Sequence, residues 1–190
     1  MHKVALGAMA VAFSLVAAPA AHAQMKVTSA EMKDGGTIAN EQVATVFNGS
    51  DCKGGNISPS LSWTGAPSGT KSFVITVYDP DAPTGSGFWH WAVFNIPAST
   101  MSIPKNAGDV KAKLMPKDAL QLRNDYGLSG YGGPCPPKGD APHHYIFTVI
   151  AADVDKLPIL KGRDTSATLG RFNLHYHTLG TASLTATYGR

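Results

Sequence analysis

The sequence predicts a mainly β protein with few helices, on three observations. Segments rich in Val, Ile, Phe, Tyr and Trp recur along the chain with the two-residue period of a strand. The 20 glycines and 13 prolines favour turns, and the prolines stand largely at the ends of these segments. Only one later segment has the apolar spacing that is typical of a helix.

Six segments are expected to form strands. In chain order they are Val43–Phe47, Leu61–Thr64, Ser72–Asp79, Phe88–Ile96, His144–Ala151 and Ser183–Tyr188. Because successive side chains of a strand point to opposite faces, Asp79 ends an otherwise apolar row in its segment. In the next segment the same alternation places His90 with Phe94, opposite Trp91.

One helix is expected near the C-terminal end. The apolar residues that share a face at helical spacing are Leu169, Phe172, Tyr176 and Leu179. Asp164 or Thr165 is available as the N-cap, and Gly180 is expected to end the helix. A second, short helical turn is expected near Lys117–Arg123.

Residues 1–23 are expected to be a secretory signal peptide, and residues 24–190 a single domain. Lys3 precedes the charge-free apolar segment Val4–Ala18, and an A-x-A site follows, with cleavage expected after Ala23. The apolar segment, at about 15 residues, is shorter than the roughly 20 of a membrane-spanning helix, so no transmembrane segment is expected. The protein is therefore predicted to be periplasmic or secreted. An uncleaved N-terminal anchor is the alternative.

The charge of the chain points to no polymeric partner. Its formal net charge is +3, and the lysines and arginines are scattered rather than clustered. A basic patch is the usual signature of proteins that bind nucleic acid or an anionic membrane surface. The sequence thus predicts no nucleic-acid partner.

The two cysteines, Cys52 and Cys135, are expected to form a disulfide. A pair of cysteines in an exported protein meets an oxidising compartment, in which such a pair usually bonds. Free thiols or metal-binding thiols are the alternatives, although no CxxC or HxxxH spacing accompanies the two residues.

Two aspartates stand at a stiff turn in the segment DPDAP. Pro80 and Pro83 stop the preceding strand and hold Asp79 and Asp81 in defined places. A buried carboxylate needs a partner, so Asp79 is a candidate site residue. The alternative is that each aspartate only caps its own turn.

Histidines and a tyrosine supply partners for this carboxylate. His90 lies in a strongly apolar strand, where the pKa of an enclosed imidazole responds to a neighbouring carboxylate, although a lone histidine there is usually a core residue. His143 and Tyr145 share a face at the start of a later strand, whereas His144 points the other way. The Gly-Pro-rich loop before them can lend backbone N–H groups from Gly132 and Gly133. These groups could converge on one small pocket.

Three motifs resemble, in order and spacing, the signature of the phosphatidylethanolamine-binding protein family. They are DPDAP at 79–83, FWHW at 88–91, and GGPCPPKG at 132–139 followed by HHY at 143–145. The chain looks most like the bacterial Raf kinase inhibitor-like branch, from about Thr37 to the terminal LTATYGR. The resemblance implies a mainly β fold, a β-sandwich built on a large antiparallel sheet with few short helices.

The same resemblance implies a ligand site. The residues that match the family's pocket are Asp79, His90, Gly133, His143 and Tyr145, whereas His144 stands where the family commonly has arginine. The family pocket binds small anions, such as phosphate or the head group of phosphatidylethanolamine. The resemblance thus implies a binding protein for a small anion or phosphorylated head group, which also modulates an unidentified protein partner. It implies no catalytic residue, cofactor or metal.

Two other functions remain open at this level. Asp79, His90 and His143 have the ligand types of a two-histidine, one-carboxylate metal triad, which would indicate a metal-dependent oxygenase or hydrolase. A third reading is a secreted protease inhibitor or a modulator of host signalling that acts through surface loops. A Ser-His-Asp hydrolase is disfavoured, because the sequence has no GxSxG segment.

Overall fold

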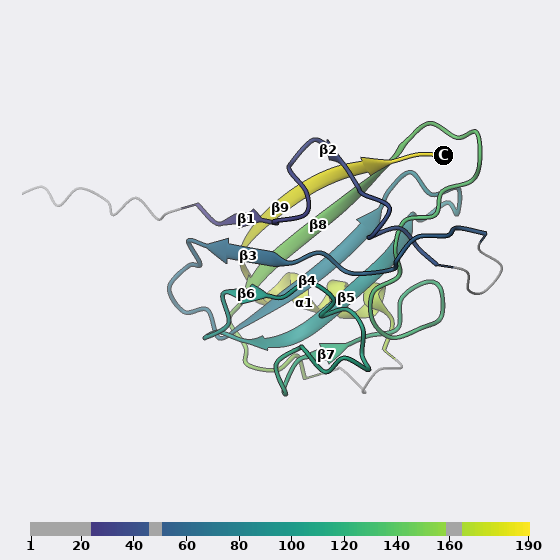
Figure 1. Ribbon diagram of the computed structural model, residues 1–190. Helices are drawn as coiled ribbons and strands as arrows, with labels where there is room; N and C mark the ends of the chain where they lie inside the picture. The colour runs from purple at the N-terminus through teal and green to yellow at the C-terminus, as the bar shows by residue number, and fades with distance from the viewer. Residues whose placement is uncertain (1–23, 46–50, 159–164) are drawn as a thin grey trace, which may run out of the picture.

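The structure, a computed structural model, describes residues 24–45, 51–158 and 165–190 (Figure 1). The expected signal peptide, residues 1–23, lies outside this part of the chain. The larger of two sheets has six strands in the order β2-β9-β8-β4-β5-β7, and only β2 and β9 are parallel neighbours. These strands are β2 (Gly36–Thr37), β4 (Ser72–Asp79), β5 (Phe88–Pro97), β7 (Leu120–Gln121), β8 (His143–Ala152) and β9 (Thr178–Tyr188).

A smaller antiparallel sheet packs on one face of the larger one. It consists of β1 (Lys26–Thr28), β3 (Leu61–Thr64) and β6 (Ser102–Ile103), in the order β1-β3-β6. Trp63 of β3 meets Phe73 of β4 edge to face, with ring centroids 5.3 Å apart, and both side chains are buried. Burying an aromatic side chain of this kind contributes about 1.5–3 kcal/mol. This arrangement confirms the mainly β fold and the sandwich built on a large antiparallel sheet.

The helix lies on the opposite face of the large sheet, behind it in Figure 1. It comprises α1 (Ala167–Leu174) and the 3-10 turn η2 (His175–His177). Its N-cap is Ser166 and not the expected Thr165, because the side chain of Ser166 accepts a hydrogen bond from the amide of Leu169. The other expected N-cap, Asp164, lies outside the described residues. The helix ends before Gly180, because that residue is already paired in β9. No helix within the described ranges is long and apolar enough to cross a membrane.

The helix packs through small residues and not through its large apolar ones. Its buried side is made of Ala167, Gly170 and Leu174. A Cβ at Gly170 would lie 2.7 Å from the ring of Phe94, so only glycine allows the helix to approach β5 this closely. The four residues whose spacing predicted the helix are exposed instead: Leu169, Phe172, Tyr176 and Leu179.

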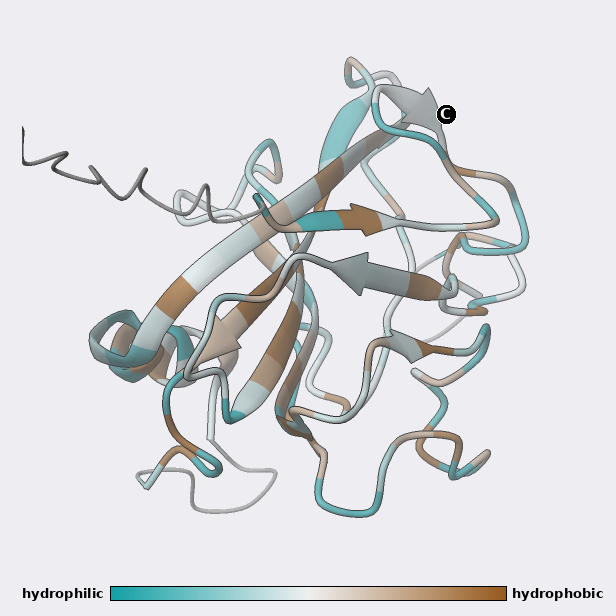
Figure 2. Cartoon of the chain, turned by 90° about the vertical axis from the view of Figure 1, so that its left-hand side faces the viewer, coloured by the Kyte–Doolittle hydropathy of each residue, from teal (hydrophilic) through white to brown (hydrophobic). Residues whose placement is uncertain are grey.

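Apolar residues alternate with more polar ones along the long strands, as Figure 2 shows by the brown and pale bands. The predicted bounds of β3 and β4 match the structure. Two other expectations are wrong. Residues 43–45 of the expected strand Val43–Phe47 form no strand, and residues 46 and 47 are not described. The amide of Ala44 instead bonds to the carbonyl of Pro134, outside any β-ladder. The segment Lys117–Arg123 contains strand β7 rather than a helical turn, because it pairs with the edge of β5.

Strand β5 contains a β-bulge at His90. Val77 pairs with Trp91, but the next residue of β4, Tyr78, pairs with Trp89, so β5 has one extra residue between these pairs. A bulge of this kind interrupts the two-residue alternation and re-aims a side chain.

The bulge decides which way His90 points. The ring of His90 lies 5.1 Å from that of Tyr145, on the side of the sheet that carries the core beneath the smaller sheet. Phe94 lies in the other core cluster, on the helix side. The expectation that His90 and Phe94 share a face is therefore wrong, because the extra residue shifts the alternation between them.

Candidate functional site

A cavity of about 190 Å³ opens at the end of the large sheet where β4 finishes and β5 and β8 begin. This size suits a small ion or a head group better than a drug-sized molecule. The lining residues are Asp79, Ala82, Pro83, Thr84, Phe88, His90, Tyr126, Cys135, Pro136, Pro137, His143 and Tyr145.

Asp79 is buried and uses both of its carboxylate oxygens. Its Oδ1 accepts hydrogen bonds from the amides of Asp81 and Ala82, at 2.8 and 3.1 Å. Its Oδ2 accepts a hydrogen bond from Nδ1 of His143, at 2.8 Å. Asp79 therefore caps its own turn and also holds a histidine of a distant strand, so the alternative that it only caps its turn is wrong.

His143 lies between two carboxylates. Its Nδ1 bonds to Asp79, and its Nε2 lies 3.5 Å from Oδ2 of Asp140. Burial lowers the pKa of His143, but the hydrogen bond and the negative charge of Asp79 outweigh it, so the pKa is raised. Because an imidazole can donate from both nitrogens only when protonated, this arrangement favours the imidazolium. The pair of His143 and Asp79 is then neutral as a whole.

His90 has the opposite protonation preference. Its Nδ1 lies 2.7 Å from the carbonyl oxygen of Gly132, which can only accept, so Nδ1 carries the proton. Burial lowers the pKa of His90 to about 4, although the Gly132 carbonyl and Asp79 act in the other direction. The ring is therefore neutral near pH ~7. Its Nε2 keeps a lone pair and lies 4.0 Å from Oδ2 of Asp79.

The hydroxyl of Tyr145 completes the buried polar groups of the cavity. It is buried and forms no well-defined hydrogen bond with a described residue. Burial raises the pKa of Tyr145, and the charge of Asp79 raises it further, so the hydroxyl keeps its proton. A buried hydroxyl without a partner costs stability, which makes this group a natural contact for a ligand atom.

Gly133 supports the cavity from behind and is not among its lining residues. Its amide donates to Oδ1 of Asn56, at 2.8 Å, and the amide of Gly132 donates to the carbonyl of His90, at 2.9 Å. The two amides that the sequence offered to the pocket are therefore already bonded within the protein. A Cβ at Gly133 would lie 2.2 Å from the carbonyl oxygen of Gln42, so packing against the segment 42–44 requires glycine here.

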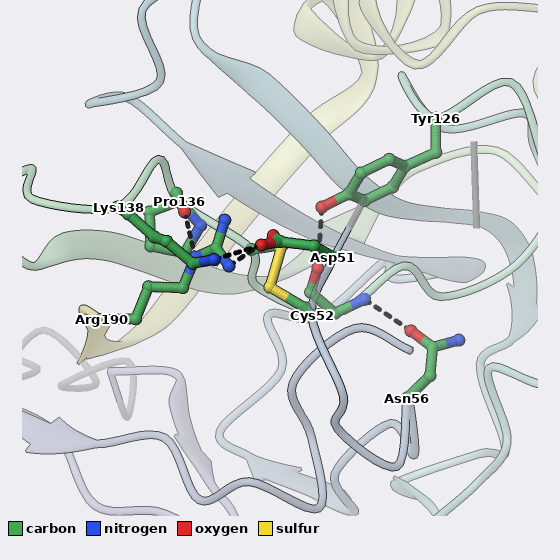
Figure 3. The surroundings of a disulfide bond; sticks show 9 residues. Asp51, Cys52, Asn56, Tyr126, Pro136, Lys138 and Arg190 are labelled. Carbon is green, nitrogen blue, oxygen red and sulfur yellow. Dashed lines mark hydrogen bonds and ion pairs between the residues drawn. A yellow bond between two sulfur atoms is a disulfide. The ribbon is translucent and has the colours of Figure 1, made fainter. Parts of the chain in front are cut away.

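The proline-rich loop is fastened on its outer side. The disulfide between Cys52 and Cys135 is present, as predicted, with a Cα–Cα distance of 6.0 Å. Figure 3 shows Asp51 beside it, bonded to Lys138 and Arg190. Arg190 also donates to the carbonyl of Pro136, at 2.6 Å. Three segments that are far apart in the sequence thus hold one wall of the cavity.

His144 lies outside the cavity, as the alternation along β8 predicted. Its side chain is exposed, and both its Nδ1 and its amide bond to Oδ2 of Asp81, at 2.8 and 2.7 Å. These two hydrogen bonds lower the pKa of Asp81, and the bond from the His144 amide has the larger effect. The pair stiffens the rim and adds no buried charge.

The geometry does not favour a metal triad. Among the described residues, the one group of three acidic, histidine or cysteine ligand atoms close enough to share an ion is Asp51, Cys52 and Cys135, and its two cysteines are used in the disulfide. His143 spends its Nδ1 on a hydrogen bond to Asp79, and His90 spends its Nδ1 on the Gly132 carbonyl.

The cavity also contains residues that the sequence did not single out. Tyr126 lines it and donates from its hydroxyl to the carbonyl of Gly133, at 3.0 Å. Asp140 faces the outer nitrogen of His143. Both residues stand in loops without periodicity, so no local pattern could have indicated them. Four of the five expected site residues line the cavity: Asp79, His90, His143 and Tyr145.

Comparison with known families and proteins gives a consistent result. The sequence model of the phosphatidylethanolamine-binding protein family matches residues 28–189. The UPF0098 protein YbcL of Escherichia coli (strain K12) is 50% identical over 168 residues, which cover 87% of this chain and 88% of that protein. The UPF0098 protein YbhB of the same strain is 47% identical over 164 residues, which cover 86% of this chain and 99% of that one.

Two solved structures share the fold. The crystal structure of E. coli YbcL, described as a new member of the mammalian PEBP family, superposes with a TM-score of 0.83 at 48% identity, and covers 88% of this chain and 99% of that one. The putative phosphatidylethanolamine-binding protein homologue CT736 of Chlamydia trachomatis D/UW-3/CX gives a TM-score of 0.68 at 30% identity, with 88% and 98% covered.

Proposed function

Because this chain belongs to the phosphatidylethanolamine-binding protein family, we propose that it is an exported binding protein whose cavity receives a small anion. The ligand is phosphate or the phosphorylated head group of a phospholipid, and the protein is not an enzyme. The observation that carries the proposal is the hydroxyl of Tyr145, which has no well-defined hydrogen bond to a described residue and is buried in a cavity that also contains Nε2 of His90 and the Asp79–His143 pair.

The charge of the site selects the protonation state of the anion. Since His143 and Asp79 neutralise each other, no net positive charge awaits a ligand at neutral pH. Nε2 of His90 accepts a hydrogen bond when the ring is neutral and donates one when it is protonated. A phosphate that keeps one proton can donate it to Nε2, and one of its other oxygens can accept from the hydroxyl of Tyr145. A fully deprotonated phosphate needs His90 to take up a proton first.

Both routes couple binding to one proton. The complex carries one extra proton, either on the anion or on His90. That proton is absent from the separate partners when His90 is neutral and the ligand is fully deprotonated. Binding therefore strengthens as the pH falls. A phosphate monoester has its second pKa near ~6, so the affinity gain is steepest above that pH and levels off below it, where the free ligand already carries the proton. Charge-assisted hydrogen bonds of this type contribute about 1.5–3 kcal/mol each before desolvation is counted.

Export is supported by the disulfide and by the sequence of the first 23 residues. A disulfide persists in the periplasm or outside the cell, whereas cytoplasmic thiols are kept reduced. Because Cys135 lines the cavity, the same bond that suits this compartment also holds the wall of the binding site. A modulated protein partner would then be extracytoplasmic as well.

Calorimetric titration with inorganic phosphate and with O-phosphoethanolamine, at about pH 5.5 and about pH 7.5, tests the proposal. We expect both ligands to bind more tightly at the lower pH, and Tyr145→Phe to weaken them. His144→Ala is the matched control, because this exposed histidine lies outside the cavity. An absence of heat with both ligands at the lower pH would overturn the proposal.

A further inference from the structure

Large apolar side chains are concentrated on the outside of the helix and at the start of β9, which follows it. Seven large hydrophobic residues are exposed in the described part of the chain, and four of them lie between positions 169 and 179. Single exposed apolar residues are ordinary, but a cluster of this kind indicates an interaction surface. We call Leu169, Phe172 and Tyr176, together with Arg171, the α1 surface; Leu179 follows in β9.

The two aromatic residues of the α1 surface stand well clear of the protein. Phe172 is 62% exposed and Tyr176 is 69% exposed, and their rings meet edge to face with centroids 6.0 Å apart. The opposite side of α1 already fills the core with Ala167, Gly170 and Leu174. The exposed aromatic pair therefore contributes little to folding, and its apolar area remains for a partner.

Arg171 adds a charge without a counter-charge to this surface. The residue is half-buried, and its guanidinium forms no hydrogen bond or ion pair with any residue that the structure describes. Burial lowers its pKa, and α1 and η2 contain no acidic residue. A partly desolvated cation is unfavourable unless it is paired, so this position favours an incoming carboxylate.

The cation stands in a groove between α1, η2 and the start of β9. The groove has a volume of about 440 Å³ and is lined by Thr168, Arg171, Phe172, His175, Thr178 and Thr181. Hydroxyl groups and one guanidinium beside an aromatic ring suit a single carboxylate on an apolar segment. They do not suit an anionic membrane, which is recognised by several lysines and arginines. Residues 165–190 contain no lysine, and Arg190 is bonded to Asp51 at the opposite end of β9.

We propose that the α1 surface is a second binding site, separate from the anion cavity, which docks a segment of a partner protein that carries an aspartate or glutamate next to large apolar residues. The carboxylate pairs with Arg171 in the groove, and the apolar residues cover Phe172 and Tyr176. The site shares no residue with the cavity.

Selection from a library of random short peptides displayed on phage tests this proposal. The library is selected on the wild-type protein and counter-selected on a Phe172→Ser/Tyr176→Ser variant, which should fold because both side chains are exposed. We expect the enriched peptides to combine Asp or Glu with Leu, Phe or Trp. The affinity of a synthetic copy of the best peptide should fall about tenfold or more in Arg171→Met, which keeps the stem but loses the charge.

Three controls make the outcome specific. Leu128→Ser removes an equally exposed apolar residue elsewhere, at 48%, and should leave the peptide affinity unchanged. His90→Ala should leave it unchanged as well, which separates this site from the anion cavity. Arg171→Glu should reverse the preference to peptides with Lys or Arg.

The proposal is overturned if no peptide is enriched, or if the enriched peptides lack acidic residues. It is also overturned if they bind the wild type and the Phe172→Ser/Tyr176→Ser variant equally well. It is also overturned if the wild type binds phosphatidylglycerol vesicles and Arg171→Met does not, because the surface would then serve a membrane. Circular dichroism and thermal unfolding of each variant show that a loss of binding is not a loss of fold.

Discussion

Asp79 and His143, 64 positions apart in the sequence, are joined by a buried hydrogen bond of 2.8 Å between Oδ2 and Nδ1. The other oxygen of Asp79 closes the turn that follows β4. One carboxylate therefore defines the end of a strand and the charge of a histidine in its neighbour β8. Because of this double role, a substitution of Asp79 should affect both the site and the fold.

Asp79→Asn should destabilise the protein by about 3–5 kcal/mol, because it removes one partner of a buried ion pair. The amide oxygen can still accept from the turn, but the positive charge of His143 loses its principal partner. The pKa of His143 should fall, which NMR titration of the ring would detect. Asp81→Asn, in the exposed pair with His144, is the matched control and should cost less than about 1 kcal/mol. Equal effects of the two variants would contradict the assigned roles.

The free energy of unfolding should be highest near pH ~6.5, the unperturbed histidine pKa. His90, whose pKa is lowered to about 4, stays neutral in the folded state while the unfolded chain binds a proton, so stability rises with pH between these values. His143, whose pKa is raised, stabilises fully below the unfolded value and loses this contribution as the pH rises through its folded pKa.

Urea unfolding over a range of pH values measures how the free energy of unfolding falls on the acid side and on the alkaline side of this maximum. We call these two sides the acid limb, which is due to His90, and the alkaline limb, which is due to His143. The His90 limb should amount to on the order of 3 kcal/mol, because one pKa unit corresponds to about 1.4 kcal/mol. His90→Phe should flatten the acid limb, and His143→Gln should flatten the alkaline limb. A curve that changes in neither variant would show that other groups determine the pH dependence.

Tyr145→Phe should stabilise the free protein and weaken anion binding. The hydroxyl has no well-defined partner within the described chain, so its removal relieves an unsatisfied buried group and should add about 1 kcal/mol. Tyr131→Phe is the matched control, because the hydroxyl of Tyr131 donates to the carbonyl of Gln42 at 3.0 Å and its loss should destabilise. Thermal unfolding and phosphate titration of both variants provide the comparison. Destabilisation by Tyr145→Phe would show that its hydroxyl is bonded in the free protein.

Replacement of both Cys52 and Cys135 by alanine should lower the free energy of unfolding by up to about 4–5 kcal/mol, the chain-entropy value for a loop of this length. The sequence separation of the two residues is 83. Because Cys135 lines the cavity, the affinity for phosphate should fall as well. Chemical unfolding and calorimetry of the double variant measure the two effects. A fully stable variant with unchanged affinity would show that the ion pairs around Asp51 hold the loop without the bond.

Local patterns indicated most of the fold correctly. The alternation in Ser72–Asp79 predicted the full length of β4, because that strand is straight and central and its side chains obey the two-residue period. The pairing of the cysteines followed from their number and the expected compartment. A helix was expected in the right region, but its N-cap is Ser166, it ends before Gly180, and its buried side was not indicated by the large residues.

The sequence by itself indicated four residues that line the cavity, because Asp79, His90, His143 and Tyr145 stand in motifs that are specific in order and spacing. Only the tertiary structure decided how they meet. The bulge at His90 arises from pairing between β4 and β5, and the helix shows its aromatic side to solvent because Gly170 fits closely on Phe94. Asp140 and Tyr126 reach the site through loop contacts. Local periodicity contains no information on such contacts, since they depend on residues far away in the chain.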